Sequence, residues 1–216
     1  MKAWRMATVA CLLSTIGASP LAAQRVYSAA LTGARVEHRV RAGSGVERGE
    51  GTLVGGQVAT TVSWVELEGH ALGGRLTARS DLGDDRTVGE IGLQASALPL
   101  PWLAFNVGAR GRSYTTRLAR QRWIAMTTGV EARVQLLDGA VRGSARLALM
   151  PAVSVSGLEA PSFAAESGAE IAYHGSLLEA GLAYSLERYD FPEFAGIRRL
   201  EQFGRLTASV GIHFSR

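Results

Sequence analysis

The chain has 216 residues, 47% of them apolar and 19% charged, and its formal net charge is +4. Lysine occurs only at position 2, so nearly all of the positive charge comes from arginines, which are scattered and interleaved with glutamates. This distribution argues against a nucleic-acid partner, because such a partner requires a concentrated basic surface.

The first 23 residues have the layout of a secretory signal peptide. Two basic residues precede an apolar run over 6–18, and small residues at 21–23 supply a cleavage site. The apolar run is shorter than the roughly 20 residues of a transmembrane helix. We therefore predict a signal peptide over 1–23 and one exported domain over 24–216. Cys11, the only cysteine, lies in the signal peptide, so the exported domain has no thiol for a disulfide, a zinc site or a nucleophile.

After the signal peptide, apolar and polar residues alternate with the period of a β-strand. Breaks in the alternation predict about ten strands, at 26–41, 52–65, 70–80, 87–98, 102–113, 122–136, 140–154, 166–174, 177–188 and 203–214. Apolar residues change sides near Gly33 in the first strand, and the eighth strand is short, so eight or twelve strands also fit. Most segments exceed the usual length of strands in globular sheets and match a tilted membrane crossing.

The connections between these strands alternate in length. Short connections are predicted at 66–69, 99–101, 137–139 and 174–176, and longer polar ones at 42–51, 81–86, 114–121, 156–165 and 189–202. Short periplasmic turns that alternate with longer outer loops are typical of outer-membrane barrels. We therefore predict an all-β protein: a single antiparallel up-and-down transmembrane β-barrel with both termini in the periplasm.

A secreted β-sandwich or a soluble barrel would also alternate. Aromatic residues near the short turns favour the membrane, because transmembrane barrels have aromatic girdles at the interface. Tyr27, Trp64, Tyr173 and Phe214 lie there, whereas Trp102 has the inward parity and does not count toward the girdle.

The last strand resembles the closing strand of bacterial outer-membrane proteins. Val210, Ile212 and Phe214 alternate and end on an aromatic, although two further residues follow it. The resemblance implies a position in the cell outer membrane, contact with its lipid, and recognition of these three residues by the barrel-assembly machinery. A monomer is expected. Ten strands are also typical of omptin proteases, but this chain is short for that family and has no matching catalytic residues.

The inward parity of the strands predicts a charged lumen. Its predicted members are Arg75, Arg79, Glu90, Arg110, Arg112, Glu131, Arg133, Arg142, Arg146, Glu170, Glu179, Glu187 and Arg205. An unpaired buried charge costs several kcal/mol, so we expect arginine–glutamate pairs that fill and rigidify the barrel. The alternative is a narrow pore, and because arginines outnumber glutamates in this set, such a pore would favour anions.

Two smaller groups raise the question of catalysis. Glu170 and Glu179 flank a short turn, but partnership with nearby arginines explains them better than a pair of catalytic carboxylates. His213 and Ser215 share the inner face and resemble the His-x-Ser pair of outer-membrane lipid A deacylases, which would make the protein a lipid-modifying enzyme. Here the pair lies at the periplasmic end, away from the outer leaflet. We therefore expect a structural or surface-exposed role, with no catalytic, metal or cofactor site.

Overall fold

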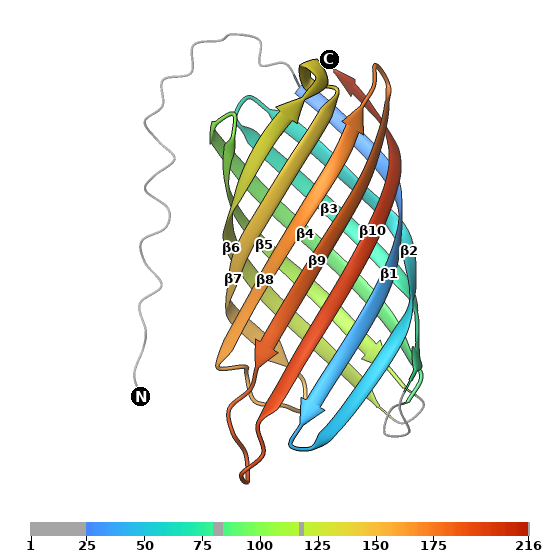
Figure 1. The fold of residues 1–216 in the computed structure, drawn as a ribbon, viewed down its shortest axis with the longest axis vertical. Helices are drawn as coiled ribbons and strands as arrows, with labels where there is room; N and C mark the ends of the chain where they lie inside the picture. The colour runs from blue at the N-terminus through green and yellow to red at the C-terminus, as the bar shows by residue number, and fades with distance from the viewer. Residues whose placement is uncertain (1–24, 80–83, 117–118, 216) are drawn as a thin grey trace.

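The computed structural model describes residues 25–79, 84–116 and 119–215, which form one closed barrel (Figure 1). The predicted signal peptide, including Cys11, lies outside the described residues. The described part contains no helix with the length and apolarity needed to cross a membrane.

Ten antiparallel strands build the barrel, as the alternation predicts. They are β1 (Arg25–Ala42), β2 (Gly45–Val62), β3 (Val65–Ala78), β4 (Arg86–Leu100), β5 (Leu103–Thr115), β6 (Arg120–Leu136), β7 (Val141–Val155), β8 (Phe163–His174), β9 (Leu178–Asp190) and β10 (Arg199–Ser215), with one turn of 3₁₀ helix, η1 (Leu137–Gly139). Each strand pairs with its sequence neighbours, and β1 pairs with β10 from Val26–Ser215 to Ala42–Arg199. This seam closes the sheet and leaves it without an edge.

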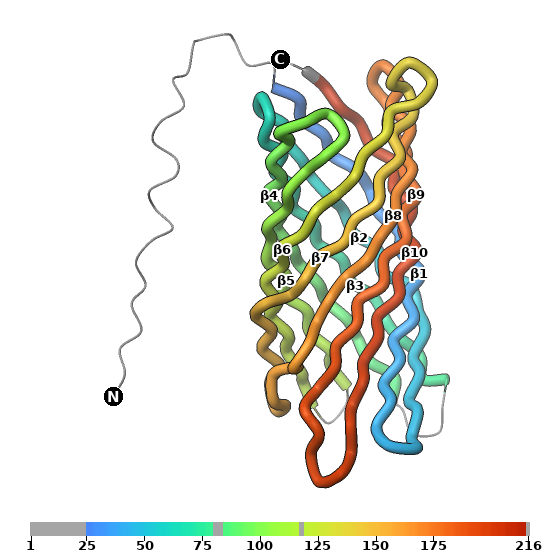
Figure 2. Tube along the Cα trace, turned by 60° about the vertical axis from the view of Figure 1, so that its left-hand side comes forward, coloured from blue at the N-terminus to red at the C-terminus, as the bar shows by residue number. Residues whose placement is uncertain are grey.

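The start of β1 and the end of β10 lie at the same end of the barrel. We call it the periplasmic end, after the orientation that the sequence predicts, and we call the opposite end the outer end. The turns at 63–64, 101–102, 137–140 and 175–177 lie at the periplasmic end and are short. Longer connections at 156–162 and 191–198 lie at the opposite, outer end, as do the end of β3 and the start of β4. Figure 2 shows the β9–β10 and β1–β2 hairpins reaching far toward that outer end.

One predicted outer loop is wrong. The sequence pattern places a connection at 42–51, but the turn contains only Gly43 and Ser44, and β2 begins at Gly45. Gly43 supports this tight hairpin with a φ of +58°, a conformation that suits glycine. The pattern misses the start of β2 because residues 45–51 are mostly glycine and charged residues, which give no apolar alternation.

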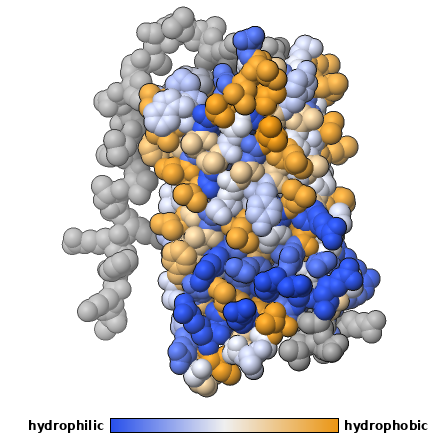
Figure 3. Space-filling view, in the orientation of Figure 1, coloured by the Kyte–Doolittle hydropathy of each residue, from blue (hydrophilic) through white to orange (hydrophobic). Residues whose placement is uncertain are grey.

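The outer surface of the barrel is apolar over most of its height. Ile124, Val130, Leu206 and Ile212 are 62%, 43%, 47% and 46% exposed, so they face outward as predicted. Figure 3 shows apolar residues over the upper part of the barrel and a band of hydrophilic residues toward the outer end. We call this apolar surface the lipid belt.

The strands are longer than the lipid belt requires. β1 has 18 residues; at about 3.3 Å per residue it is about 60 Å long. Even with a tilt of about 45° it rises about 40 Å, whereas the apolar band of such barrels is about 25 Å tall. The strands therefore extend beyond the belt at the outer end.

This extension explains the change of apolar side near Gly33. β1 keeps one parity throughout, but beyond Gly33 its inner face carries buried Val36 and its outer face carries Arg35 and Glu37. The same set of alternate residues of β1 faces inward along the whole strand, and only the medium outside the barrel changes. Within the belt the outside is lipid, and beyond it the outside is water, so apolar residues move to the interior.

Aromatic residues mark the periplasmic edge of the belt. Tyr27 and Phe214 stack across the β1–β10 seam with ring centroids 5.5 Å apart, and Trp64 and Tyr173 are about half exposed. Trp102 belongs with them, contrary to its predicted inward parity: it lies in the β4–β5 turn and is 58% exposed. Strand parity does not apply there because β5 begins one residue later, at Leu103.

Candidate functional site

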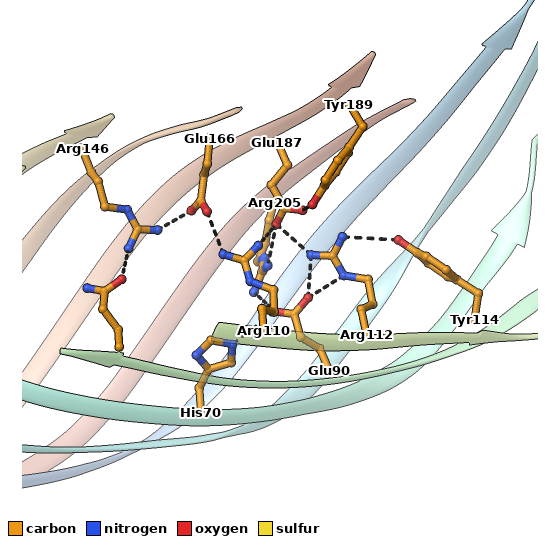
Figure 4. Close-up of polar contacts among 11 residues, drawn as sticks. His70, Glu90, Arg110, Arg112, Tyr114, Arg146, Glu166, Glu187, Tyr189 and Arg205 are labelled. Carbon is orange, nitrogen blue, oxygen red and sulfur yellow. Dashed lines mark hydrogen bonds and ion pairs between the residues drawn. The ribbon is translucent and has the colours of Figure 1, made fainter. Parts of the chain in front are cut away.

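A cluster of buried ion pairs crosses the middle of the lumen, drawn in Figure 4. Glu187 on β9 is its centre, with a side chain that is 0% exposed. Arg110 and Arg112 on β5 and Arg205 on β10 all donate to Glu187, at 2.7 Å for Arg112 and 3.4 Å for Arg205. Glu90 on β4, also 0% exposed, accepts from Arg112 at 2.6 Å and lies 2.8 Å from Arg205. We call these five residues the central cluster.

Glu166 and Arg146 extend this cluster toward β7 and β8. Glu166 accepts from Arg110 at 2.7 Å and also pairs with Arg146. Arg146 donates a further hydrogen bond of 2.6 Å to the side-chain oxygen of Gln94. The chain of contacts therefore runs from β4 across the lumen to β7, and ties together strands that are not neighbours in the sheet.

The strand alternation places these groups inside, and the barrel brings them together. Arg110 and Arg112 are two residues apart on β5, so both point into the lumen. Glu187 is 75 residues from Arg112 in sequence, and the contact depends on the narrow width of a ten-stranded barrel. In a low-dielectric interior such pairs are stable only when each charge has partners, and the cluster supplies several to each glutamate.

Apolar and aromatic side chains fill the lumen on the outer side of the central cluster. The aromatic plug, as we call it, comprises Tyr114, Trp123, Tyr189, Phe191 and Phe203, all at most 5% exposed. Trp123 makes edge contacts with Tyr114, Tyr189 and Phe191 at ring-centroid distances of 5.0–6.4 Å.

The aromatic plug and the central cluster are joined directly. The guanidinium of Arg112 lies 3.7 Å from the ring centroid of Phe203, within the range of a cation–π contact. Tyr189 donates its hydroxyl to Glu187 at 2.7 Å. Further out, His38 lies 3.0 Å from Glu201 and stacks on Tyr114. The outer half of the lumen is thus a packed core among the described residues.

On the periplasmic side of the central cluster the lumen is open. A cavity of about 610 Å³ lies there, and we call it the vestibule. Arg133 links Glu131 and Glu66 along its wall at 2.6 and 2.9 Å, and Arg142 lies 3.8 Å from Glu170. The lining contains five arginines and six glutamates among the described residues. This near balance removes the basis for the anion preference expected from the sequence.

The structure places eleven of the predicted lumen residues on the inner face and brings most of them into pairs. These are Glu90, Arg110, Arg112, Glu131, Arg133, Arg142, Arg146, Glu170, Glu179, Glu187 and Arg205. Glu170 pairs with Arg142 and Glu179 lies 3.8 Å from His174, so each carboxylate has a separate partner.

The inward placement predicted for Arg75 and Arg79 is wrong. Leu72 and Leu76 are the buried inner residues of β3, so the odd-numbered positions face outward. The side chain of Arg75 is 70% exposed and donates to Asp85, and that of Arg79 is 59% exposed and lies 3.6 Å from Glu50. The error arises because β3 also passes beyond the lipid belt, where charged residues face water on the outside.

Several lumen residues were not identified from the sequence: Glu66, Glu68, His70, Glu166 and Glu201. Glu166 has the same parity as Glu170, so the alternation of β8 contained the signal. The sequence pattern places Glu66 and Glu68 in a turn and predicts the wrong parity for β3. For the same reason it does not identify His70, which lies 3.3 Å from Glu90.

Comparison with solved structures identifies the fold. The outer membrane protease OmpT from Escherichia coli superposes with a TM-score of 0.58 at 8% identity, over 93% of this chain and 99% of that one. Neisserial surface protein A is 11% identical over 88% of this chain and 97% of its own (TM-score 0.40). The translocator domain of the autotransporter NalP from Neisseria meningitidis is 13% identical over 89% and 88% (TM-score 0.43).

No protein-family model matches the sequence, and no curated protein matches it. At 8% identity the likeness to OmpT establishes the fold alone. This chain therefore has the fold of an outer-membrane β-barrel, with an apolar exterior that suits contact with lipid and a buried charged network in its lumen.

Proposed function

We propose that the protein is a structural barrel of the outer membrane that does not conduct and acts without catalysis. The observation that supports this most is the filled outer half of the lumen. Phe203 is 1% exposed and Trp123 is 5% exposed, and the central cluster lies directly beneath them. A solute would have to displace both the aromatic core and several ion pairs to cross.

The outer end of the barrel supports a role at the cell surface. Outward-facing charges form a patch on one side of the barrel beyond the lipid belt. We call this patch the charged collar, and its members are Arg35, Glu37, Arg39, Arg48, Glu50, Arg75 and Arg79. These residues lie on or beside the paired strands β1–β3, so the collar is held rigidly and presents charges of both signs. Such a surface suits contact with lipid headgroups or with other molecules at the envelope.

The vestibule favours a second candidate, a narrow pore. Its polar walls and volume of about 610 Å³ would hold water, and a path past Arg146 and Arg110 would make it a channel. A lipid-modifying enzyme has less support, because His213 lies at the end of the barrel where the chain ends, and the side chain of Ser215 is outside the described residues.

Single-channel recording in planar bilayers tests the proposal. We expect the wild-type barrel to be silent. The triple variant Trp123→Ala/Phe203→Ala/Arg112→Ala should show current steps, because it removes the bulk of the aromatic plug and also opens the central cluster. Heat-modifiable gel mobility shows that each sample contains folded barrel. Current steps in the wild type would favour the channel instead, if the same steps are smaller in the variants Arg110→Gln or Arg146→Gln.

A further inference from the structure

Three side chains of types that can ligate a metal, two histidines and one glutamate, meet at the periplasmic end of the lumen. His174 is the last residue of β8, Glu179 is the second residue of β9, and His213 is near the end of β10. His174 and Glu179 are direct partners in the β8–β9 register, and Glu179 pairs with Gly211, two residues before His213. All three therefore point inward from adjacent strands.

Their ligand atoms lie close together. One nitrogen of each histidine and one oxygen of Glu179 are all within 4.8 Å of one another. His174 Nδ1 is 3.8 Å from Glu179 Oε2, and the two imidazole rings meet edge to face with centroids 6.2 Å apart. Small side-chain rotations would bring these atoms to the 2.0–2.2 Å bonds that zinc makes with nitrogen and oxygen.

A second observation points to a ligand between these groups. Nε2 of His174 and Nδ1 of His213 are buried and have no hydrogen-bond partner among the described residues. Buried polar atoms in folded proteins almost always have a partner, and an unmet one costs about 1–3 kcal/mol. A cation bound through these two nitrogens, one from each imidazole, would give both of them a partner.

We propose that His174, Glu179 and His213 bind a divalent transition-metal cation of the zinc class, which enters from the periplasm through the vestibule. Two histidines and one carboxylate are a recognised zinc ligand set that leaves one position open for water. Imidazole ligands favour zinc-like metals over calcium or magnesium. This site is separate from the central cluster and does not depend on the structural role proposed above.

The surrounding charges set the strength of binding. Glu66 and Glu170 line the same vestibule and favour a cation, whereas Arg142 lies among them and opposes it. Arg142 is already paired with Glu170 at 3.8 Å, which offsets part of its repulsion. We expect Arg142→Gln to bind the metal more tightly than the wild type.

Metal titration of the purified full-length barrel tests the proposal. The barrel is purified with a tag that contains no histidine, and a chelator removes bound metal before the titration. We expect cobalt(II) to give the visible absorption bands of a histidine-ligated site, and zinc to displace it with one ion per chain. Loss of an outer partner of a metal ligand already weakens binding about 10- to 100-fold. His174→Ala, His213→Ala and Glu179→Gln should each weaken zinc binding by at least about tenfold.

His70→Gln is the matched control, because His70 is also a lumen histidine beside a glutamate but lies outside the proposed site. It should keep the affinity of the wild type. Zinc binding that is equal in the wild type and in His174→Ala/His213→Ala would overturn the proposal, as would the lack of any submillimolar binding in the wild type. If the double variant does not fold, chemical modification of the wild type by diethyl pyrocarbonate tests the site instead. Zinc should protect His174 and His213 from modification, and modification that is unchanged by zinc would count against the site.

Discussion

Removing the charge of Glu187 should destabilise the barrel strongly. In Glu187→Gln the side chain keeps its shape but loses the charge that Arg110, Arg112 and Arg205 share. These guanidiniums would then rely on Glu90 and on Glu166. Because Glu187 is fully buried, water does not replace the lost charge.

Breaking a buried ion pair by removal of one partner costs about 3–5 kcal/mol, and we expect Glu187→Gln to lie in that range. Part of the loss comes from the excess of positive charge, because Arg110, Arg112 and Arg205 are then left with only Glu90 and Glu166 as partners. The double variant Glu187→Gln/Arg205→Met should therefore recover about 1 kcal/mol or more relative to the sum of the single changes, as contacting residues in one network do.

Equilibrium urea unfolding in phospholipid vesicles, followed by tryptophan fluorescence, measures these differences. Glu37→Gln is the matched control: Glu37 also has two arginine partners, Arg39 at 3.0 Å and Arg48 at 3.3 Å, but it lies in the charged collar and is 46% exposed. Its loss should cost less than about 1 kcal/mol. If Glu187→Gln were no more destabilising than Glu37→Gln, the central cluster would not stabilise the barrel as argued.

Three other changes test the seam, the belt and the closing strand. Gly211→Ala should destabilise the barrel by about 1–3 kcal/mol, because a Cβ there would lie 2.5 Å from the backbone oxygen of Ala29. Gly33→Ala is the control and should be tolerated in the same unfolding assay, because a Cβ at position 33 has nothing within 4 Å. Leu93→Arg should cost about 2–4 kcal/mol if it lies near the bilayer midplane, since Leu93 is 72% exposed on the lipid belt; vesicle unfolding that matches the wild type would argue against lipid contact there. Phe214→Ala should reduce the amount of folded barrel in the outer membrane, measured by heat-modifiable gel mobility of cell samples, because the resemblance assigns Phe214 to recognition during assembly. The free energy of unfolding in vesicles should change little.

The alternation of the sequence is enough to predict about ten strands, their antiparallel order and most of the lipid-facing residues, although eight or twelve strands also fit it. A transmembrane strand has a simple rule, oily outside and polar inside, and residues such as Leu206 and Arg110 follow it. The rule reverses where the barrel leaves the membrane. Arg75 and Arg110 have the same alternating surroundings in sequence, but one faces water outside and the other faces partners inside.

The contacts across the lumen could not be predicted in the same way. Parity places Arg112 and Glu187 inside, but their meeting depends on the barrel width and on how the strands are staggered around it. The proposed metal site has the same limitation: His174 and Glu179 are close in sequence, whereas His213 joins them only through the register of β9 and β10.

In the non-conducting role that we propose, the vestibule ends at the central cluster and the aromatic plug, and the described residues then form a chamber with a single mouth. Any small molecule that enters it must leave by the way it came. Selection on such a chamber acts on how long an occupant is retained and at what local concentration. In a pore, by contrast, selection acts on how fast solutes cross.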